Sequence, residues 1–346
     1  MTATVETHED VAAIPDWDAL MDSCAAPAFY SSAFLTAYRK ADLLPADAHA
    51  YLVLRGEDGA ARAALPATLM PQMDPFGCLS VYEPAVAARP RGLLSHAWHC
   101  YDTWMPTAGG DIAPPDAAAL LAAFRSLAAE FAAPWYGLIN VDATGPLSAA
   151  LTALGAHGLP IDERYVLDLP PGYGLEDYLA ALPGRDRYTL RAHRRRAEAA
   201  GAQVCILEPA VADLDAHADL VRLIGARHGS ADPLPRGGFQ DFLLRLGDAA
   251  RVVEVRLGGE LVGSGACLLD ARRLHFWTCG LDYESAPSFS PFYVLFYETL
   301  RYAIELGMRR FECGRRNGGF KRRYGMRPIP LLAYLSPTRR PLVART

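Results

Sequence analysis

The sequence predicts an α/β (α+β) protein in which one fold occurs twice, each copy a mixed, largely antiparallel sheet flanked by helices. Alanine-rich amphipathic stretches alternate with short runs of β-branched or aromatic residues, which is typical of mixed helices and strands. The order hairpin, strand, helix and strand occurs once in each half of the chain. A chain of 346 residues, 51% of them hydrophobic, is also long enough for two ordinary domains.

The first copy is expected to begin with a hairpin, because a β-rich run is followed by glycines and a second β-rich run. Its elements, in order, are strands at residues 50–55 and 63–67 around a turn at 56–59, a helix at 115–132, and a strand at 135–141. Residues 142–169 finish this copy with a further helix and strand. We expect residues 1–18 to be a mobile lead-in and the N-terminal domain to span 19–170.

The second copy repeats this order within a C-terminal domain that spans residues 171–346. Strands are expected at 251–257 and 260–269, joined by a turn at Gly258 and Gly259, and a further strand at 273–280. A helix over 292–306 ends at Gly307, where a glycine favours helix termination, and leads into a strand at 308–313. The different spacing in the two halves indicates a diverged duplication rather than a short repeat array.

Composition excludes several classes of protein. No run of about 18 apolar residues is present, so no stable membrane insertion is expected. Residues 1–18 contain acids but no Lys or Arg, unlike a secretory signal. The seven cysteines include no C-x-x-C pair, and His96, His99 and Asp102 lie in a stretch without a helical pattern, so we expect neither disulfides nor a metal site. A reduced, cytoplasmic location fits these features.

Residues 185–201 form the most basic segment of a chain whose net charge is −5. On a helix, Arg187, Arg191, Arg194 and Arg195 would share one face, because they lie three or four residues apart. Such a cluster either binds a polyanion, which would relieve the repulsion between its charges, or is a solvated face neutralised by nearby acids such as Asp186 and Glu198. The composition leaves both interpretations open.

A second basic segment, residues 312–325, contains four glycines and Lys321, one of only two lysines in the chain. Glycines and fixed cations can bring N–H groups and positive charge close to a phosphate or an oxyanion. The segment is not a phosphate loop of the G-x-x-x-x-G-K-[ST] kind, because Phe320 separates Gly319 from Lys321. A basic surface turn is the alternative.

Two acids and a group of mostly aromatic residues complete the candidate site. Asp282 and Glu312 lie at the ends of predicted strands and are candidates for a general base, or for ion-pair partners of Arg315, Arg316 or Arg323. The residues expected to line a substrate pocket are Trp277, Tyr283, Tyr293, Asn317 and Tyr324. The tyrosines could instead belong to the core or its rim.

The order of several segments resembles a known family. These segments are residues 27–35, 182–201, 252–269, 303–314 and 320–325, the last reading Phe-Lys-Arg-Arg-Tyr-Gly. Together they resemble the GNAT-superfamily branch of Fem-type aminoacyl transferases, in which two GNAT folds are joined in one chain. The resemblance covers about residues 29–336 and implies two tandem GNAT-like folds, the second of which carries the donor site. It also implies amide formation by direct attack of an amine on an acyl ester or thioester, with Lys321 near phosphate or the oxyanion.

One departure from this fold's ordinary acetyltransferases concerns the donor. They bind the coenzyme A pyrophosphate with a glycine-containing turn before the main helix, whereas residues 281–291 contain no glycine. The leading hypothesis is therefore transfer from aminoacyl-tRNA to an amine, without a cofactor. A small-molecule acceptor is favoured, because the inserted coiled-coil arm common in Fem-type enzymes that read tRNA is not visible. The residues expected to hold donor phosphates are Arg191, Arg194, Arg195, Arg315, Arg316, Arg322 and Arg323.

Two alternatives stay open. The donor could be an acyl-CoA or an acyl-carrier protein, with the same arginines holding nucleotide phosphates or the acidic face of the carrier. The chain could also be a non-catalytic module that uses the basic helix to bind RNA or an acidic partner.

Overall fold

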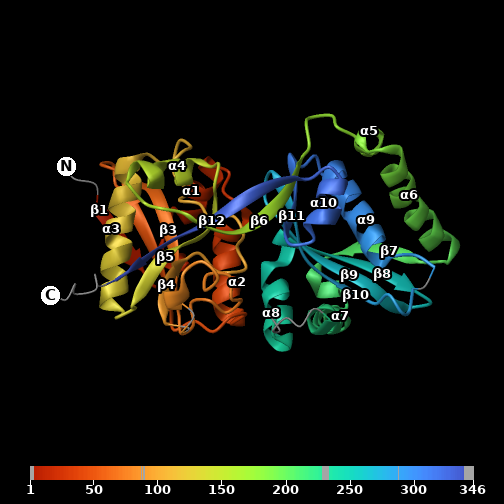
Figure 1. Cartoon of the computed structure of the whole chain (residues 1–346), viewed down its shortest axis with the longest axis horizontal. Helices are drawn as coiled ribbons and strands as arrows, with labels where there is room; N and C mark the ends of the chain where they lie inside the picture. Colours follow the sequence, from red (N-terminus) through yellow and green to blue (C-terminus); the bar gives the residue numbers. More distant parts are fainter. Residues whose placement is uncertain (1–3, 87, 89, 228–233, 287, 339–346) are drawn as a thin grey trace. The chain divides into compact units, whose positions relative to one another are not determined.

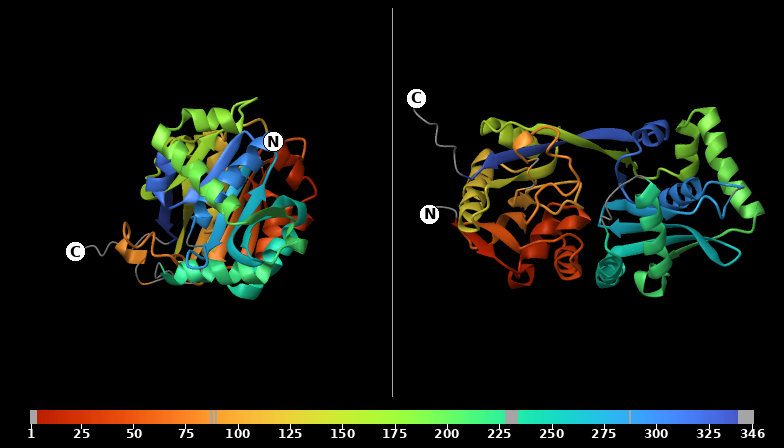
Figure 2. Two further views of the ribbon diagram at one scale, coloured as in Figure 1. Left: turned by 90° about the vertical axis from the view of Figure 1, so that its right-hand side faces the viewer. Right: turned by 60° about the horizontal axis from the view of Figure 1, so that its bottom comes forward.

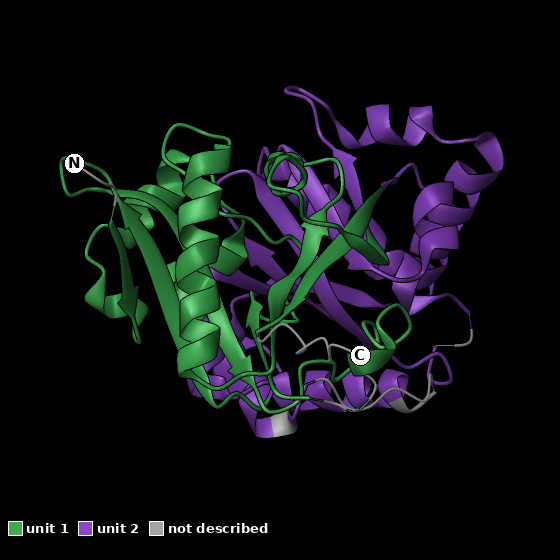
Figure 3. Ribbon diagram, turned by 60° about the vertical axis from the view of Figure 1, so that its left-hand side comes forward, with its two compact units in different colours: residues 1–36, 45–163, 329–346 green, residues 37–44, 164–328 purple. Residues whose placement is uncertain are grey.

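The computed structural model describes residues 4–86, 88, 90–227, 234–286 and 288–338. The chain forms two compact units, each assembled from separate stretches of sequence (Figure 3). Unit 1 contains Met1–Thr36, Pro45–Glu163 and Ile329–Thr346. Unit 2 contains Ala37–Leu44 and Arg164–Pro328.

Unit 1 has a mixed sheet whose strands follow the order β1-β2-β3-β4-β5-β12. All neighbours are antiparallel except β4 and β5, which are parallel. The strands are β1 (Thr4–His8), β2 (Ala48–Arg55), β3 (Ala61–Met70), β4 (Gly92–Ser95), β5 (Trp135–Asp142) and β12 (Arg327–Pro337). Residues 4–8, expected to belong to a mobile lead-in, form β1, because their backbone pairs with β2 from Thr4↔Arg55 to His8↔Tyr51.

Helices cover this sheet and bury its apolar face. They are α1 (Trp17–Ser23), α2 (Ser32–Ala41, which ends in unit 2), α3 (Pro114–Glu130) and α4 (Pro146–Ala153), with 3-10 turns at Val11–Ala13, Ala28–Tyr30 and Pro84–Val86. Helix α3 begins with proline, whose fixed φ suits the first helical turn. It packs on β2, β3 and β5 through Leu120 and Phe124, both fully buried.

Unit 2 repeats this arrangement with the strand order β7-β8-β9-β10-β11-β6. Its strands are β6 (Leu159–Asp168), β7 (Gln203–Leu207), β8 (Ala250–Leu257), β9 (Glu260–Leu269), β10 (Arg273–Leu281) and β11 (Arg310–Arg315). Its helices are α5 (Leu175–Ala181), α6 (Gly184–Ala199), α7 (Leu214–Arg227), α8 (Arg236–Leu246), α9 (Pro291–Glu305) and α10 (Gly318–Arg323), with 3-10 turns at Pro209–Val211 and Gly247–Ala249.

The predicted duplication is visible in the strand pairing. In unit 1, hairpin β2–β3 leads to β4, α3 and β5; in unit 2, hairpin β8–β9 leads to β10, α9 and β11. In each unit the two strands joined by the helix are the parallel pair. The predicted fold class, two mixed and largely antiparallel sheets flanked by helices, is confirmed.

Two strands continue from one unit into the other. Strand β6 begins in unit 1 and pairs with β11 of unit 2, while β12 leaves unit 2 and pairs with β5 of unit 1. The last strand of the chain therefore completes the sheet of the first copy. The domain boundary at residues 170 and 171 stays a prediction, and it did not include a return of the chain to unit 1 at Ile329.

Helices α9 and α7 cover opposite faces of the unit 2 sheet (Figures 1 and 2). A Cβ atom added to Gly263 of β9 would lie 2.9 Å from Pro291 of α9, and one added to Gly280 of β10 would lie 2.4 Å from Leu220 of α7. Gly280 pairs with Ser264, the neighbour of Gly263, and neighbouring strand residues face opposite sides of a sheet. Glycine at these two positions lets each helix pack closely.

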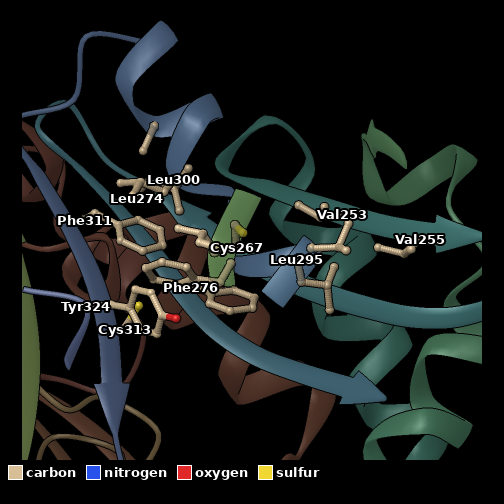
Figure 4. Close-up of a cluster of buried hydrophobic side chains, with 14 of the residues drawn as sticks. Val253, Val255, Cys267, Leu274, Phe276, Leu295, Leu300, Phe311, Cys313 and Tyr324 are labelled. Carbon is tan, nitrogen blue, oxygen red and sulfur yellow. The ribbon is translucent and has the colours of Figure 1, made fainter. Parts of the chain in front are cut away.

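The core beneath α9 is aromatic and aliphatic (Figure 4). The rings of Phe276 and Phe311, from the parallel strands, are stacked with centroids 6.4 Å apart, and Phe296 of α9 packs edge-on against Phe311 at 5.9 Å. This packing joins α9 to both β10 and β11 and fixes the positions of the two strands relative to the helix. Within the described residues, no helix is long and apolar enough to span a membrane.

Candidate functional site

The parallel strands β10 and β11 pair over only part of their lengths. Their register runs from Arg273↔Arg310 to His275↔Glu312, although β10 continues to Leu281. Beyond this point β10 pairs with β9 only and β11 with β6 only, each through a shifted register. We call these two stretches, residues 276–281 and 313–315, the β10–β11 fork. Along these two stretches the backbones of β10 and β11 do not pair with each other.

Lys321 holds the end of β11 in place. Its side chain is 6% exposed, and its Nζ donates hydrogen bonds to the carbonyl oxygens of Cys313 (2.6 Å), Gly314 (3.2 Å) and Arg315 (2.7 Å). An ammonium group has three donors, so carbonyls occupy all of them. A direct hydrogen bond from Lys321 to a phosphate or oxyanion would require one carbonyl to be released.

The neighbours of Lys321 fasten α10 to the rest of unit 2. The ring of Phe320 lies 5.2 Å from Phe296 of α9, and that of Tyr324 lies 5.7 Å from Tyr293. Arg323 forms an ion pair with Asp186 of α6, and the Arg322 guanidinium lies 5.2 Å above the ring of Tyr165. Each residue from Phe320 to Tyr324 therefore has a partner on another element of unit 2.

Gly318 opens α10 at a point where no side chain fits. A Cβ atom there would lie 2.2 Å from the Tyr165 hydroxyl oxygen, whereas a Cβ atom at Gly319 would meet nothing within 4 Å. We expect Gly318→Ala to destabilise the protein by about 1–3 kcal/mol through overpacking. Gly319→Ala is the matched control and should be neutral. Tyr165→Phe should partly rescue Gly318→Ala in urea unfolding, and equal losses from the two glycine variants would contradict this account.

Between β11 and α10 the backbone takes a left-handed path. Arg316 (φ +65°) and Asn317 (φ +50°) are both exposed. Asparagine tolerates this conformation, but an arginine in it costs roughly 1–2 kcal/mol. Among the described residues, none forms a hydrogen bond or ion pair with the Arg316 guanidinium. A strained arginine without a partner among the residues that the structure describes is a candidate for ligand contact.

The two candidate bases differ in their surroundings. Glu312 is fully buried, and both of its carboxylate oxygens accept hydrogen bonds at 2.8 Å from Arg164, itself 2% exposed. Asp282 is half-buried and accepts hydrogen bonds from Glu284 N, Ser285 N and Ser285 Oγ. The ion-pair alternative thus describes Glu312, although with Arg164 rather than the nearby arginines. Asp282 is the more accessible of the two acids.

The predicted pocket residues lie on several elements of unit 2. Trp277 packs against Phe239 and Phe242 of α8, with ring centroids 6.2 and 5.2 Å away. Tyr293 and the fully buried Tyr324 lie at the contact between α9 and α10. Tyr283, in the loop before α9, is 40% exposed, and Asn317 lies in the left-handed turn. A single pocket lined by all five remains a prediction.

The basic segment is helix α6, and acids neutralise part of it. Arg191 is paired with Glu176, and Arg194 with Glu198 and with the buried Glu298 of α9. Arg195 instead lies with its guanidinium carbon 5.8 Å from the ring centroid of Tyr188. The two interpretations of this segment therefore apply to different faces of one helix.

Helix α6 also covers the start of α9. The Ser290 N–H, at the N-cap of α9, donates to Nδ1 of His193 at 3.0 Å, and the His193 ring stacks on Tyr293 with centroids 4.5 Å apart. Burial, with a smaller contribution from the charge of Arg196, lowers the pKa of His193 and keeps Nδ1 available as an acceptor. Pro291 follows and has no N–H. Two of the backbone positions that usually face an anion at a helix N-terminus are thus unavailable.

The equivalent strand pair of unit 1 is closed by its own chain. After β4, the chain returns to β5, where Asn140 Nδ2 donates to the carbonyl of Cys100 (2.7 Å) and Thr103 N–H to that of Asn140 (3.0 Å). His96 is buried and bonded to Phe29 O and Ala97 N. No group of three or more potential metal ligands occurs in the described part of the chain.

Two buried histidines make stability depend on pH. Burial lowers the pKa of His96 to about 4 and that of His217 to about 3, from 6.5. Below pH 6.5 the unfolded chain binds protons that the folded chain does not, so the free energy of unfolding falls as pH falls. At pH 5 we expect a loss of roughly 4 kcal/mol relative to pH 7.5, at about 1.4 kcal/mol per pH unit for each histidine.

Urea unfolding between pH 7.5 and 5 measures this loss. The pKa values of Asp16, Asp168 and Asp270 are lowered from 3.8, so these acids change the stability mainly below this pH range. Replacing His217 with glutamine should remove about half of the slope. An unfolding free energy that does not change over this range would contradict the prediction.

Comparisons with known proteins agree with the fold. Residues 184–322 match the acetyltransferase (GNAT) domain family. The chain is similar to the crystal structure of FemX, with 13% identity, a TM-score of 0.64, and 96% of this chain and 97% of that one covered. It is also similar to a tandem GNAT protein from the clavulanic acid biosynthesis pathway, with 16% identity, a TM-score of 0.55, and 97% of this chain and 99% of that one covered. A third similar structure is L-PGS from Bacillus licheniformis, with 13% identity, a TM-score of 0.57, and 94% of this chain and 91% of that one covered. No curated protein matches the sequence.

Proposed function

We propose that this chain, whose residues 184–322 match the GNAT domain family, is an N-acyltransferase that transfers an aminoacyl group from aminoacyl-tRNA to the amine of a small molecule. The observation that carries this choice of donor is the covered start of α9. In acyl-CoA enzymes of this fold, free backbone N–H groups there bind the pyrophosphate. Here His193 occupies the Ser290 N–H, and Pro291 lacks one.

In the proposed reaction, the neutral amine attacks the ester carbonyl carbon of the aminoacyl group. A C–N bond forms, the C–O bond to the terminal ribose breaks, and the amine proton ends on the ribose oxygen. Asp282, half-buried at the end of β10, is the acid that we assign to relay this proton, directly or through water. Glu312 keeps its structural pairing with Arg164.

Lys321 would act by position and by charge. Its bonds to the carbonyls of Cys313, Gly314 and Arg315 shape the β11 side of the fork, and its positive charge lies beside the peptide groups that would meet the ester. A fixed charge in a buried site stabilises a developing oxyanion without reorganising during the reaction. Arg315, Arg316 and Arg322 lie next to it in sequence and supply positive charge for the phosphates of the donor.

The experiment that tests the donor compares binding of coenzyme A and of charged tRNA to the full chain at about 50 and 200 mM salt. We expect tRNA to bind in a salt-dependent way and coenzyme A not to bind. Tight binding of coenzyme A without binding of tRNA would overturn the proposal and leave an acyl-CoA-dependent transferase of the same fold. Transfer to candidate amines then identifies the acceptor.

Arg316 provides a variant that separates donor binding from folding. Arg316→Gly should weaken tRNA binding several-fold while leaving the free energy of unfolding unchanged or up to about 1 kcal/mol higher, because glycine relieves the left-handed strain. Arg316→Gln, the matched control, removes the charge but keeps the strain. It should weaken binding equally without any gain in stability. Unchanged binding in both variants would exclude Arg316 from the donor site.

A further inference from the structure

The two faces of α6 differ in whether their arginines are paired with carboxylates. With 3.6 residues per turn, His193 and Arg194 lie on the same side as the buried Leu190 and Ala197. This side faces α9, because His193 bonds to Ser290 and Arg194 to Glu298. Residues 188, 195 and 199 fall roughly half a turn away. The helix therefore has an inner face packed on α9 and an outer face turned away from it.

The arginines that face inward or toward α5 have partners in unit 2. Arg194 is paired with Glu298 and Glu198, and Arg191 with Glu176. Arg187 donates to the carbonyls of Leu179 (3.5 Å) and Ala180 (3.4 Å). The charges and hydrogen-bond donors of these side chains are engaged by groups of unit 2, so few donors remain for a ligand.

The positive charge of the outer face is not neutralised by carboxylates of the described residues. Arg195 and Arg196 are exposed, and no carboxylate in the described part of the chain pairs with either. Tyr188 beside them is 65% exposed, and the Arg195 guanidinium lies 5.8 Å from its ring centroid. Together with Ala192 and Ala199 these residues line a shallow hollow of about 260 Å³. We call Tyr188, Arg195 and Arg196, with this hollow, the basic outer face.

We propose that the basic outer face binds the phosphodiester backbone of the donor RNA away from its aminoacyl end. Guanidinium groups form paired hydrogen bonds to phosphate oxygens, and an exposed tyrosine ring offers a stacking surface for a ribose or base. The chain has a net charge of −5, so this face is a local exception that attracts a polyanion. This inference rests on the proposed function.

The placement of the face explains why it would not contact the reacting ester. Helix α6 packs on α9, and α9 packs on β8 to β11, so a layer of helix separates the outer face from the sheet that carries the fork. An RNA that reaches both must extend across this layer. The basic outer face therefore adds affinity for the whole RNA, whereas the fork holds its aminoacyl end.

The test uses two probes and two variants of the full chain. The probes are a charged tRNA and an aminoacylated CCA trinucleotide, which carries the same reacting ester but lacks the rest of the RNA. The test variant is Arg195→Gln combined with Arg196→Gln. The control is Arg191→Gln, which removes an arginine from the same helix that is already paired with Glu176. The three substituted arginines are partly or fully exposed, and thermal unfolding verifies that the variants fold.

We expect the double variant to bind tRNA at least tenfold more weakly and to lose about two units from the slope of log Kd against log salt. Its transfer from the trinucleotide should equal that of the wild-type chain, and Arg191→Gln should match the wild type with both probes. Unchanged tRNA binding in the double variant would overturn the inference while leaving the proposed function in place. So would equal losses with tRNA and trinucleotide.

Failure of the proposed function itself gives a different pattern. If the wild-type chain neither binds tRNA nor uses the trinucleotide, both proposals are overturned. If it instead binds an acidic acyl-carrier protein and the double variant loses that binding, the basic outer face is a protein-docking surface and the assignment to RNA is wrong.

Discussion

Arg164→Met is expected to lower the free energy of unfolding by roughly 3–5 kcal/mol. The Arg164 side chain is 2% exposed and gives two 2.8 Å hydrogen bonds to the fully buried carboxylate of Glu312. Methionine fills a similar volume without charge. The variant therefore leaves Glu312 buried, with the Arg310 guanidinium 3.8 Å away.

A double-mutant cycle separates the pair from the packing around it. Combining Arg164→Met with Glu312→Leu should restore most of the loss, because an apolar pair replaces a buried ion pair at little cost. Arg310→Gln, at a partly exposed position, serves as the control and should cost about 1 kcal/mol or less. Urea unfolding at pH 7.5 measures all four variants. A loss below about 1 kcal/mol for Arg164→Met would show that water or another group solvates Glu312.

The elements that could be predicted from the sequence are those that depend on neighbouring residues. The hairpins around Gly56–Gly59 and Gly258–Gly259 and the helices α3 and α9 follow from local alternation, turn glycines and helix ends. The exchange of β6 and β12 between the units could not be predicted in this way. A strand has the same local pattern whichever sheet it joins, and the choice depends on contacts between distant residues.

The same limit applies to the candidate site. Composition drew attention to Lys321, Glu312 and α6, but not to their partners. Arg164 is 148 positions from Glu312, and Glu298 is 104 positions from Arg194. An arginine in the sequence does not reveal whether a distant acid will neutralise it. This is why Arg191 and Arg194 were predicted as phosphate ligands alongside Arg195, although the structure gives them carboxylate partners.

Lys321→Met is expected to have the largest effect on activity. Three carbonyl oxygens at the end of β11 would lose their shared donor, so the free energy of unfolding should fall by at least about 3 kcal/mol. The removal of a fixed charge beside the proposed oxyanion should also slow transfer by about 100-fold or more. The rate is measured with saturating donor at a temperature where both proteins are fully folded, which thermal unfolding establishes beforehand.

Phe320→Ala is the control that distinguishes the charge of Lys321 from the anchoring of α10. The Phe320 ring packs against Phe296 and Tyr324, so its removal should loosen α10 and cost roughly 2–4 kcal/mol while retaining the positive charge of Lys321. If transfer falls much further in Lys321→Met than in Phe320→Ala at comparable stability, the positive charge contributes to the reaction itself. If the two rates fall together, Lys321 acts only by holding the end of β11, and the oxyanion must be stabilised by the backbone N–H groups of the fork.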